Sequence, residues 1–421
     1  MRRSIIATAM AAGLTLALTA CGGSTTPASP TAGGGATNQA TPTTSAPPAN
    51  GGKLTIWVDE TRIVGFKKLG EQFKTDTGVT LDVVQKPSGD IAKDFAAQVP
   101  TGKGPDLIVT AHDGTGNLVK NGVVAPVELG DATAGLSKAA LDGFRYEGQL
   151  YGVPYAVENI GLVRNNKLAT ETPATLDELI AAKPAAAQYP LLIQQGDQGD
   201  AYHLYPVQTS FGAPVFKQND DGTFSKDLGM EGEPGHKFAA YLKTLTSKGV
   251  LNASIGGDQA KQAFLDGKSP YIVTGPWWTG EFTKAGMDIT VLPVPSAGGQ
   301  PATPFLGVQG VLMSSKSENA LLANQFLTYV ASEKTQEMLY ETGGRLPANE
   351  KAAATVTGKD KILGGFADAG KGAAPMPNIP AMAAVWQFWG GTEISIINGK
   401  AANPTAAWDE MIKNIKSNMA G

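Results

Sequence analysis

Apolar and polar residues first form a regular pattern at residues 54–58, where the sequence LTIWV is rich in β-branched and aromatic side chains and predicts a strand. Apolar side chains then recur three and four positions apart from residue 63, which predicts a helix that ends at Gly78. The alternation continues with a strand at 79–85, a helix at 91–99 and a strand at 105–111. Strands that alternate with short helices predict a mainly parallel sheet covered on both faces.

A second region of similar alternation follows further along the chain. Strands are predicted at 190–194 and 270–274, and helices at 235–248 and 258–265. The C-terminal third is mainly helical in its pattern, with helices predicted at 318–331, 333–342 and 404–417. Because the chain has 421 residues, two α/β lobes are a better interpretation than one long sheet.

The first 50 residues lack this pattern and are left out of the predicted fold. Arg2 and Arg3 precede an apolar stretch at residues 4–20, so residues 1–20 have the features of a secretory signal peptide. The stretch is shorter than the ~20 apolar residues that a membrane-spanning helix needs. It is followed at once by Cys21, the only cysteine of the chain.

Cys21 ends the string LTAC at residues 18–21. Residues 1–20 could be an ordinary cleaved signal peptide that a chance cysteine follows, or an anchor that stays in the membrane. The string resembles instead the lipobox of bacterial lipoproteins. That resemblance implies cleavage before Cys21 and lipids on this residue, with ~0.8 kcal/mol of membrane affinity for each buried methylene. Residues 21–50 consist mostly of Gly, Ser, Thr, Ala and Pro without charge, so we expect a disordered tether behind the anchor.

Composition and motifs exclude several functions. The chain has 34 Lys and Arg against 38 Asp and Glu, without blocks of like charge, so no nucleic-acid partner is expected. Gly267, Lys268 and Ser269 resemble the end of a phosphate-binding loop, but Gln262 stands where its first glycine is required. The three histidines are far apart in sequence, so no metal site is expected. Gly114, Thr115 and Gly116 lack the third glycine of a dinucleotide-binding motif, and no cofactor is expected. Two of the 38 acidic residues could still form a pair for glycosidic cleavage, which keeps a carbohydrate-active enzyme as an alternative.

Tryptophans are placed unevenly, with close pairs at Trp277 and Trp278 and at Trp386 and Trp389. Both pairs lie in segments bounded by Gly and Pro, which is unusual for side chains that only fill a core. A pyranose ring needs aromatic faces for its C–H surface, and carboxylates, amides and hydroxyls for its hydroxyl groups. The pairs therefore indicate a sugar site, whereas Trp408 on the last predicted helix is expected in the core.

From residue 53 to residue 421 the chain resembles the maltose- and maltodextrin-binding proteins of ABC importers. The resemblance is carried, in the family's order, by KLTIWV at 53–58, KGPDLIVTAHD at 103–113, YGVPYAVEN at 151–159, TGPWW at 274–278, VLPVP at 291–295, PFLGVQG at 304–310 and MPNIPAMAAVW at 376–386. It implies a two-lobe α/β fold of the type II periplasmic-binding-protein class, which closes about a hinge over an interlobe ligand cleft.

The same resemblance implies three crossings between the lobes, near residues 156–159, 304–307 and 358–361. Each lobe would then be discontinuous in sequence. The N-terminal lobe would hold residues 51–157 and 308–357, and the C-terminal lobe residues 158–307 and 358–421.

The family's sugar-binding residues carry over to part of this chain. The resemblance implies ligand contacts from Glu60, Arg62, Asp113, Glu158, Asp200, Tyr202, Trp277, Trp386, Gln387 and Trp389. Trp277 and Trp386 would stack on sugar rings, and the acidic residues would accept hydrogen bonds from hydroxyl groups. His112 is expected to be structural, and Arg345 could either reach the cleft or only orient its loop.

Four positions depart from the family's pattern. Thr110 replaces an aromatic residue, Gly114 an arginine, Gln387 a tyrosine and Gly390 a later arginine, while Trp389 is an additional aromatic. These changes remove bulk and charge from one flank of the site. They leave another oligosaccharide, trehalose or a polyol open as the ligand.

The function that the resemblance implies is binding without catalysis. The protein would capture malto-oligosaccharides at the extracytoplasmic face of the cell membrane, where its lipid holds it. Its partners would be ABC permease subunits and, through them, a cytoplasmic ATPase, and it would act as a monomer.

Overall fold

The computed structural model describes residues 51–171, 173–219 and 224–419, and the expected signal peptide, Cys21 and the tether lie outside the described residues. The strands are β1 (Lys53–Val58), β2 (Thr80–Gln85), β3 (Leu107–Ala111), β4 (Arg145–Tyr146), β5 (Gln149–Leu150), β6 (Gly152–Glu158), β7 (Gly161–Asn165), β8 (Phe216–Gln218), β9 (Phe224–Leu228), β10 (Tyr271–Thr274), β11 (Ile289–Leu292), β12 (Phe305–Met313), β13 (Leu346–Pro347) and β14 (Ala374–Pro375). The α-helices are α1 (Ile63–Thr77), α2 (Ile91–Gln98), α3 (Thr115–Lys120), α4 (Lys138–Gly143), α5 (Leu176–Ala181), α6 (Ala201–Thr209), α7 (Glu233–Ser247), α8 (Gly257–Leu265), α9 (Thr279–Lys284), α10 (Ala320–Ala331), α11 (Glu333–Gly343), α12 (Glu350–Thr357), α13 (Lys361–Ala369), α14 (Ala381–Ile397) and α15 (Pro404–Met419).

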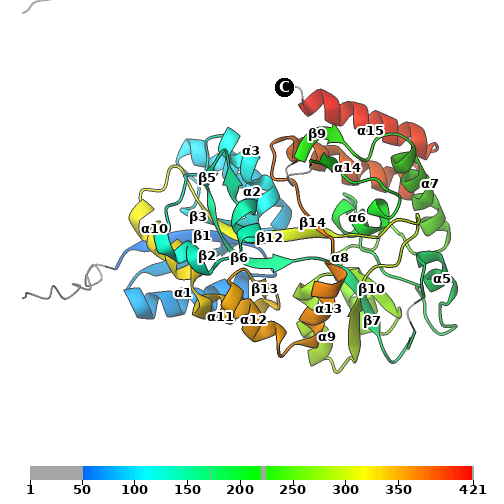
Figure 1. Ribbon diagram of the computed structural model, residues 1–421, viewed down its shortest axis with the longest axis horizontal. Coiled ribbons are helices and arrows are strands. Elements are labelled where there is room, and N and C mark those ends of the chain that lie inside the picture. The colour runs from blue at the N-terminus through cyan, green and yellow to red at the C-terminus, as the bar shows by residue number, and fades with distance from the viewer. Residues whose placement is uncertain (1–50, 172, 220–223, 420–421) are drawn as a thin grey trace, which may run out of the picture. The chain divides into compact units, whose positions relative to one another are not determined.

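The larger sheet has the strand order β13-β6-β12-β3-β1-β2, and β14 pairs with β12. β1 lies parallel to β2 and to β3. The chain moves from β1 out to β2 and then back past β1 to β3, so right-handed crossovers place α1 and α2 on opposite sides of the sheet (Figure 1).

The prediction of a mainly parallel sheet is wrong, because β12 runs antiparallel to both β3 and β6, and β13 antiparallel to β6. The sheet is mixed because β6, β12 and β13 do not come from successive βα units. β6 and β12 lie side by side up to the pair Glu158 and Gly307. Figure 1 shows both strands extending toward the part of the molecule that holds β7, β10 and α8.

A smaller sheet of three antiparallel strands has the order β10-β7-β11. The strand predicted at 270–274 is confirmed as β10, and the helices predicted in this region are confirmed as α7 and α8. The prediction of a strand at 190–194 is wrong, since Leu192 forms only an isolated bridge to Ile272.

The C-terminal third is helical as predicted, with α10, α11 and α15 in the expected places. Trp408 is fully buried, as expected, and its indole N–H donates to the carbonyl of Met230 at 2.8 Å. Gly78 closes α1 with a positive φ of 78°, which confirms the predicted helix end. No helix in the described part of the chain has both the length and the apolar character to cross a membrane.

Buried apolar side chains form separate clusters. One cluster holds side chains from Leu54 to Ala156 and from Val308 to Ala348. Two others hold side chains from Ile160 to Phe305 and from Phe366 to Ile415. Along the chain, the buried side chains pass from one cluster to another near each of the three expected crossings. This pattern supports the proposed lobe boundaries.

Candidate functional site

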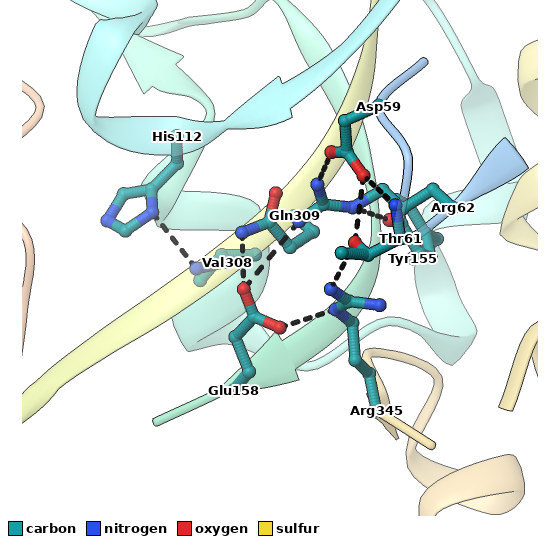
Figure 2. Close-up of polar contacts among 9 residues, drawn as sticks. All are labelled: Asp59, Thr61, Arg62, His112, Tyr155, Glu158, Val308, Gln309 and Arg345. Carbon is teal, nitrogen blue, oxygen red and sulfur yellow. Dashed lines mark hydrogen bonds and ion pairs between the residues drawn. The ribbon is translucent and has the colours of Figure 1, made fainter. Parts of the chain in front are cut away.

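Glu158, the last residue of β6, lies at the centre of a buried polar network (Figure 2). Its carboxylate accepts hydrogen bonds from Gln309 Nε2 and from Arg345 Nε, each at 2.5 Å, and lies 3.7 Å from Arg62 Nη2. Burial opposes ionisation of this carboxyl. The charges of Arg345 and Arg62 and the hydrogen bonds from Arg345 and Gln309 outweigh burial and hold the pKa of Glu158 below its usual value.

Arg345 connects this network to two other segments. Its Nη2 donates to the hydroxyl of Thr61 at 2.9 Å, and its guanidinium lies 5.8 Å from the ring centroid of Trp277. A guanidinium at that distance from an indole is attracted by the negative face of the ring. Sequence reasoning left the position of Arg345 open, and the structure places it between Glu158 and Trp277.

Arg62 completes the network on its other side. Its Nε donates to the hydroxyl of Tyr155 at 2.8 Å, and its Nη1 bonds to the buried carboxylate of Asp59. Asp59 also accepts from the backbone and the hydroxyl of Thr61, both at 2.8 Å. Two carboxylates thus face two guanidiniums, so the network has no net charge.

A second group of predicted residues meets around α14. The indole N–H of Trp386 donates to Asp113 Oδ2 at 2.7 Å, and the Trp386 ring stacks on Trp389 with centroids 5.3 Å apart. Asp113 lies in η3 (His112–Gly114), directly after β3, so it stands at the C-terminal end of a central strand of the larger sheet. Both Asp113 and Trp386 are partly exposed and can offer polar and aromatic surface to a ligand.

Asp200 precedes α6 and caps its first turn. Its Oδ1 accepts from the backbone N–H of His203 at 3.1 Å and lies 2.9 Å from Nδ1 of the same residue, and Gln194 Nε2 donates to Oδ2 at 2.5 Å. Burial opposes ionisation of Asp200, but the charge of His203 and these hydrogen bonds hold its pKa below the usual value. The cap sets the first turn of α6, which carries Tyr202.

Tyr202 and Trp277 connect these groups. Burial first, and then the charges of Glu158, Asp200 and Asp113, raise the pKa of the Tyr202 phenol well above its usual value. Trp277 lies in η5 (Pro276–Trp278), with its ring nearly perpendicular to that of His203 at a centroid distance of 6.0 Å. Seven predicted site residues therefore lie in one neighbourhood, namely Arg62, Asp113, Glu158, Asp200, Tyr202, Trp277 and Trp386.

Two predicted residues lie outside these contacts, and a third, Trp389, lies beneath Trp386 in the core. Glu60 and Gln387 are exposed and take no part in the contacts above. Trp389 is fully buried, and its indole N–H donates to Gln208 at 3.0 Å, so no face of this ring is left for a ligand. We therefore correct its role from a sugar contact to a support for Trp386.

His112 is structural, as expected. Its Nδ1 accepts from the backbone N–H of Val308 at 3.0 Å, so Nε2 carries the hydrogen toward the carbonyl of Met376 at 2.9 Å. Burial lowers the pKa of this imidazole. His112 thereby fixes β12 and the segment before α14 beside η3.

Sequence reasoning missed Asp59, Thr61, Tyr155, Gln309 and His203. Gln309 gave a usable signal, because it is a polar residue inside the apolar strand PFLGVQGVLM. Asp59 follows a buried strand directly, which is also where polar site residues gather in α/β sheets.

Two cavities border the network around Glu158. One includes Arg62, Tyr155 and Arg345 in its lining, and the other includes Glu158, Asn159 and Phe366. Neither is lined by Tyr202, Trp277 or Trp386. The site is therefore assigned from the convergence of its side chains and not from an enclosed hollow.

The chain is similar to several characterised binding proteins. It is 27% identical over 380 residues to the galactooligosaccharide-binding protein of Bacillus subtilis, covering 87% of this chain and 90% of the relative. It is 26% identical over 391 residues to the maltodextrin-binding protein MdxE of the same organism, covering 89% and 92%. The solved structure of the Thermus thermophilus maltotriose binding protein bound with maltotriose matches with a TM-score of 0.80 and 29% identity, over 87% of this chain and 100% of that chain.

These similarities confirm the expected resemblance and the two-lobe α/β fold of periplasmic sugar-binding proteins. The family model of the bacterial extracellular solute-binding protein matches residues 68–364, which is more than half of the chain. The chain therefore belongs to the family of bacterial extracellular solute-binding proteins.

Proposed function

We propose that this protein captures malto-oligosaccharides outside the cytoplasmic membrane and delivers them to an ABC permease. The observation that carries the proposal is the meeting of Trp277, Tyr202 and Trp386 with Asp113, Glu158 and Asp200. Aromatic faces bury the C–H surface of a pyranose, and fixed carboxylates pair its hydroxyl groups. The names of MdxE and of the maltotriose-binding structure support the choice of α-glucans.

The charges of the site favour a neutral ligand. Arg62 and Arg345 are each paired with a carboxylate, so neither guanidinium is left as a strong site for an acidic sugar. Asp113 and Asp200 add negative charge nearby, which disfavours an anion further. An uncharged oligosaccharide meets hydrogen-bond acceptors here without a net electrostatic penalty.

The hinge mechanism follows from where these residues lie. Glu158 and Gln309 belong to β6 and β12, the strands at two proposed crossings, whereas Tyr202, Trp277 and Trp386 belong to the proposed C-terminal lobe. A sugar that contacts both groups of residues stabilises the closed conformation, and it does so only to the extent that it binds the closed conformation more tightly than the open one. The permease would then recognise the closed form.

The remaining parts of the proposal concern place and partners. Lipids on Cys21 hold the protein at the extracytoplasmic face of the membrane, and residues 21–50 act as the tether. The protein acts as a monomer, without catalysis, and passes sugar to permease subunits coupled to a cytoplasmic ATPase. The relative from Streptococcus pneumoniae that is named a maltooligosaccharide ABC transporter solute-binding lipoprotein supports the anchor and the partners.

A second candidate ligand is a galacto-oligosaccharide. The similarity to the galactooligosaccharide-binding protein favours it, together with Thr110, Gly114, Gln387 and Gly390, which remove bulk and charge from one flank. A smaller flank admits a differently linked glycan.

Calorimetric titration of the purified protein with maltotriose, maltotetraose, trehalose and a galacto-oligosaccharide tests the proposal. We expect the two α-glucans to bind with the highest affinity. Binding of the galacto-oligosaccharide alone would refute the malto-oligosaccharide assignment and leave the family unchanged. Chromatography of each sugar after incubation tests catalysis, because a binding protein returns its ligand intact.

A further inference from the structure

Glu393 on α14 is a buried acid that the proposed site does not use. Its side chain has 0% exposure, and neither carboxyl oxygen accepts a hydrogen bond of normal geometry among the described residues; the indole of Trp389, which donates to Gln208, is the one nearby group that favours the ionised form. By contrast, the buried carboxylates of Asp59 and Glu158 are bonded to arginines. An isolated ionised carboxylate at such a depth is very costly, so Glu393 requires a separate explanation.

Asp200 lies against the same part of α14. Gly199, with a positive φ of 74°, has the carbonyl of Gly390 where its own side chain would be, and Gly390 lies three positions before Glu393. The backbone at Gly199 therefore packs directly against the backbone of α14 at Gly390, with no side chain between them. Asp200 is the charged group whose field acts on Glu393.

The other elements packed on α14 bring no compensating charge. α7 and α15 bury apolar residues, including Phe238 and Trp408. In η3 the carboxylate of Asp113 is bonded to Trp386, and the His112 imidazole is bonded at both nitrogens. On α6 the one nearby basic side chain is His203, whose Nδ1 is directed at Asp200.

A fully buried carboxyl beside a partly buried carboxylate cannot ionise at small cost, because the two like charges repel. Asp200 is the one that keeps its charge, because it accepts hydrogen bonds from His203 and Gln194. No group of three or more His, Cys, Asp or Glu in the described part of the chain could hold a metal ion there. The compensating positive charge for Glu393 is therefore a proton.

We propose that Glu393 is a positioning residue of the sugar site, a neutral carboxylic acid behind Asp200 that keeps the Asp200 cap and hence Tyr202 in place. The inference rests on the proposed function. Burial, and next the charge of Asp200, raise the pKa of Glu393 well above its usual value, which agrees with the geometry. Ionisation of Glu393 at alkaline pH would set two negative charges against each other and loosen the cap.

The pH dependence has a definite sign. The unfolded chain releases the Glu393 proton near the ordinary pKa of ~4.3, whereas the folded protein retains it. Stability from this group is thus fully present below that pH and is lost as the pH rises through the folded pKa. Glu393→Gln keeps the shape and remains neutral, so its profile lacks this loss.

The experiment compares the full chain with Glu393→Gln and with the control Glu410→Gln, an exposed position on α15. Melting temperature and maltotriose affinity are measured from about pH 6 to about pH 9. We expect wild type and Glu410→Gln to lose affinity more steeply than Glu393→Gln, the difference approaching about tenfold for each pH unit once Glu393 is ionised, because every other titrating group is common to the three proteins. Parallel profiles of wild type and Glu393→Gln would overturn the proposal.

Two further measurements keep the proposal separate from the sugar assignment. The melting profile needs no ligand, so it tests Glu393 even if maltotriose does not bind. Infrared difference spectra of the wild type at neutral pH should show the carbonyl stretch of a protonated carboxylic acid that is missing in Glu393→Gln. If that variant does not fold, loss of the band in the wild type at alkaline pH serves instead, and its absence at neutral pH would exclude the neutral acid.

Discussion

Trp386 donates its indole N–H to Asp113 over 2.7 Å, although 273 positions separate the two residues in sequence. The bond joins η3, at the C-terminal end of β3, to α14. It fixes the plane of a partly exposed indole and leaves the second carboxylate oxygen of Asp113 without a bond to Trp386. One residue pair can therefore offer a stacking face and an acceptor to the same sugar ring.

Asp113→Ala should weaken sugar binding by about tenfold or more, because a hydrogen bond to a charged group is worth ~1.5–3 kcal/mol. Asp113→Asn retains an acceptor oxygen and should lose less. Calorimetry with maltotriose measures both, with the exposed Asp131→Ala as control. Equal affinity of Asp113→Ala and wild type would remove Asp113 from the site.

Trp386 and Trp389 provide a matched pair on one helix. Trp389 is fully buried, so Trp389→Ala should lower the free energy of unfolding by about 3–5 kcal/mol. Trp386→Ala should instead reduce sugar affinity with a smaller loss of stability, since its ring is partly exposed. Chemical denaturation and titration of both variants separate the two roles, and similar losses of stability would place Trp386 in the core as well.

The sequence predicted regular elements better than long-range pairs. Helix periodicity and Gly78 located α1, because those signals are local. The mixed sheet was not predicted, since the antiparallel placement of β12 between β3 and β6 depends on distant strands. Buried strands also look alike in sequence whether their neighbours run parallel or antiparallel.

The candidate site, too, was predicted only in part, because its contacts join residues that are distant in sequence. Motif order selected Glu158, Trp277 and Trp386 as candidates, but residue type alone did not distinguish the partly exposed ring of Trp386 from the buried ring of Trp389. Arg345 could not be assigned from sequence because its partner Glu158 lies 187 positions away. Burial and pairing of this kind arise only when the chain is folded.

Arg345 and Glu158 should be coupled in stability. Arg345→Met leaves the buried Glu158 carboxylate with less compensation, so we expect a loss of about 3–5 kcal/mol in the free energy of unfolding. The double variant Arg345→Met with Glu158→Gln should lose less than the sum of the single variants, because the neutral amide no longer needs a cation. Urea denaturation of the four proteins gives the coupling energy, and additive losses would contradict a buried ion pair.

Acid should weaken the network through Glu158. The pKa of Glu158 lies below its usual value, because the charges of Arg345 and Arg62 and the hydrogen bonds from Arg345 and Gln309 outweigh burial. Its stabilising contribution is therefore present above the unfolded pKa of ~4.3 and is lost as the pH falls through the folded pKa. The stability difference between wild type and Glu158→Gln should shrink as the pH falls below about 4.

Asp200 also has a lowered pKa and contributes its own loss of stability in acid. Because Asp200 is present in both proteins, it cancels when wild type is compared with Glu158→Gln at each pH. Thermal denaturation at a series of pH values measures the difference, with Glu410→Gln as an exposed control. A difference that stays constant from neutral to acid pH would mean that Glu158 is not held ionised by the two arginines.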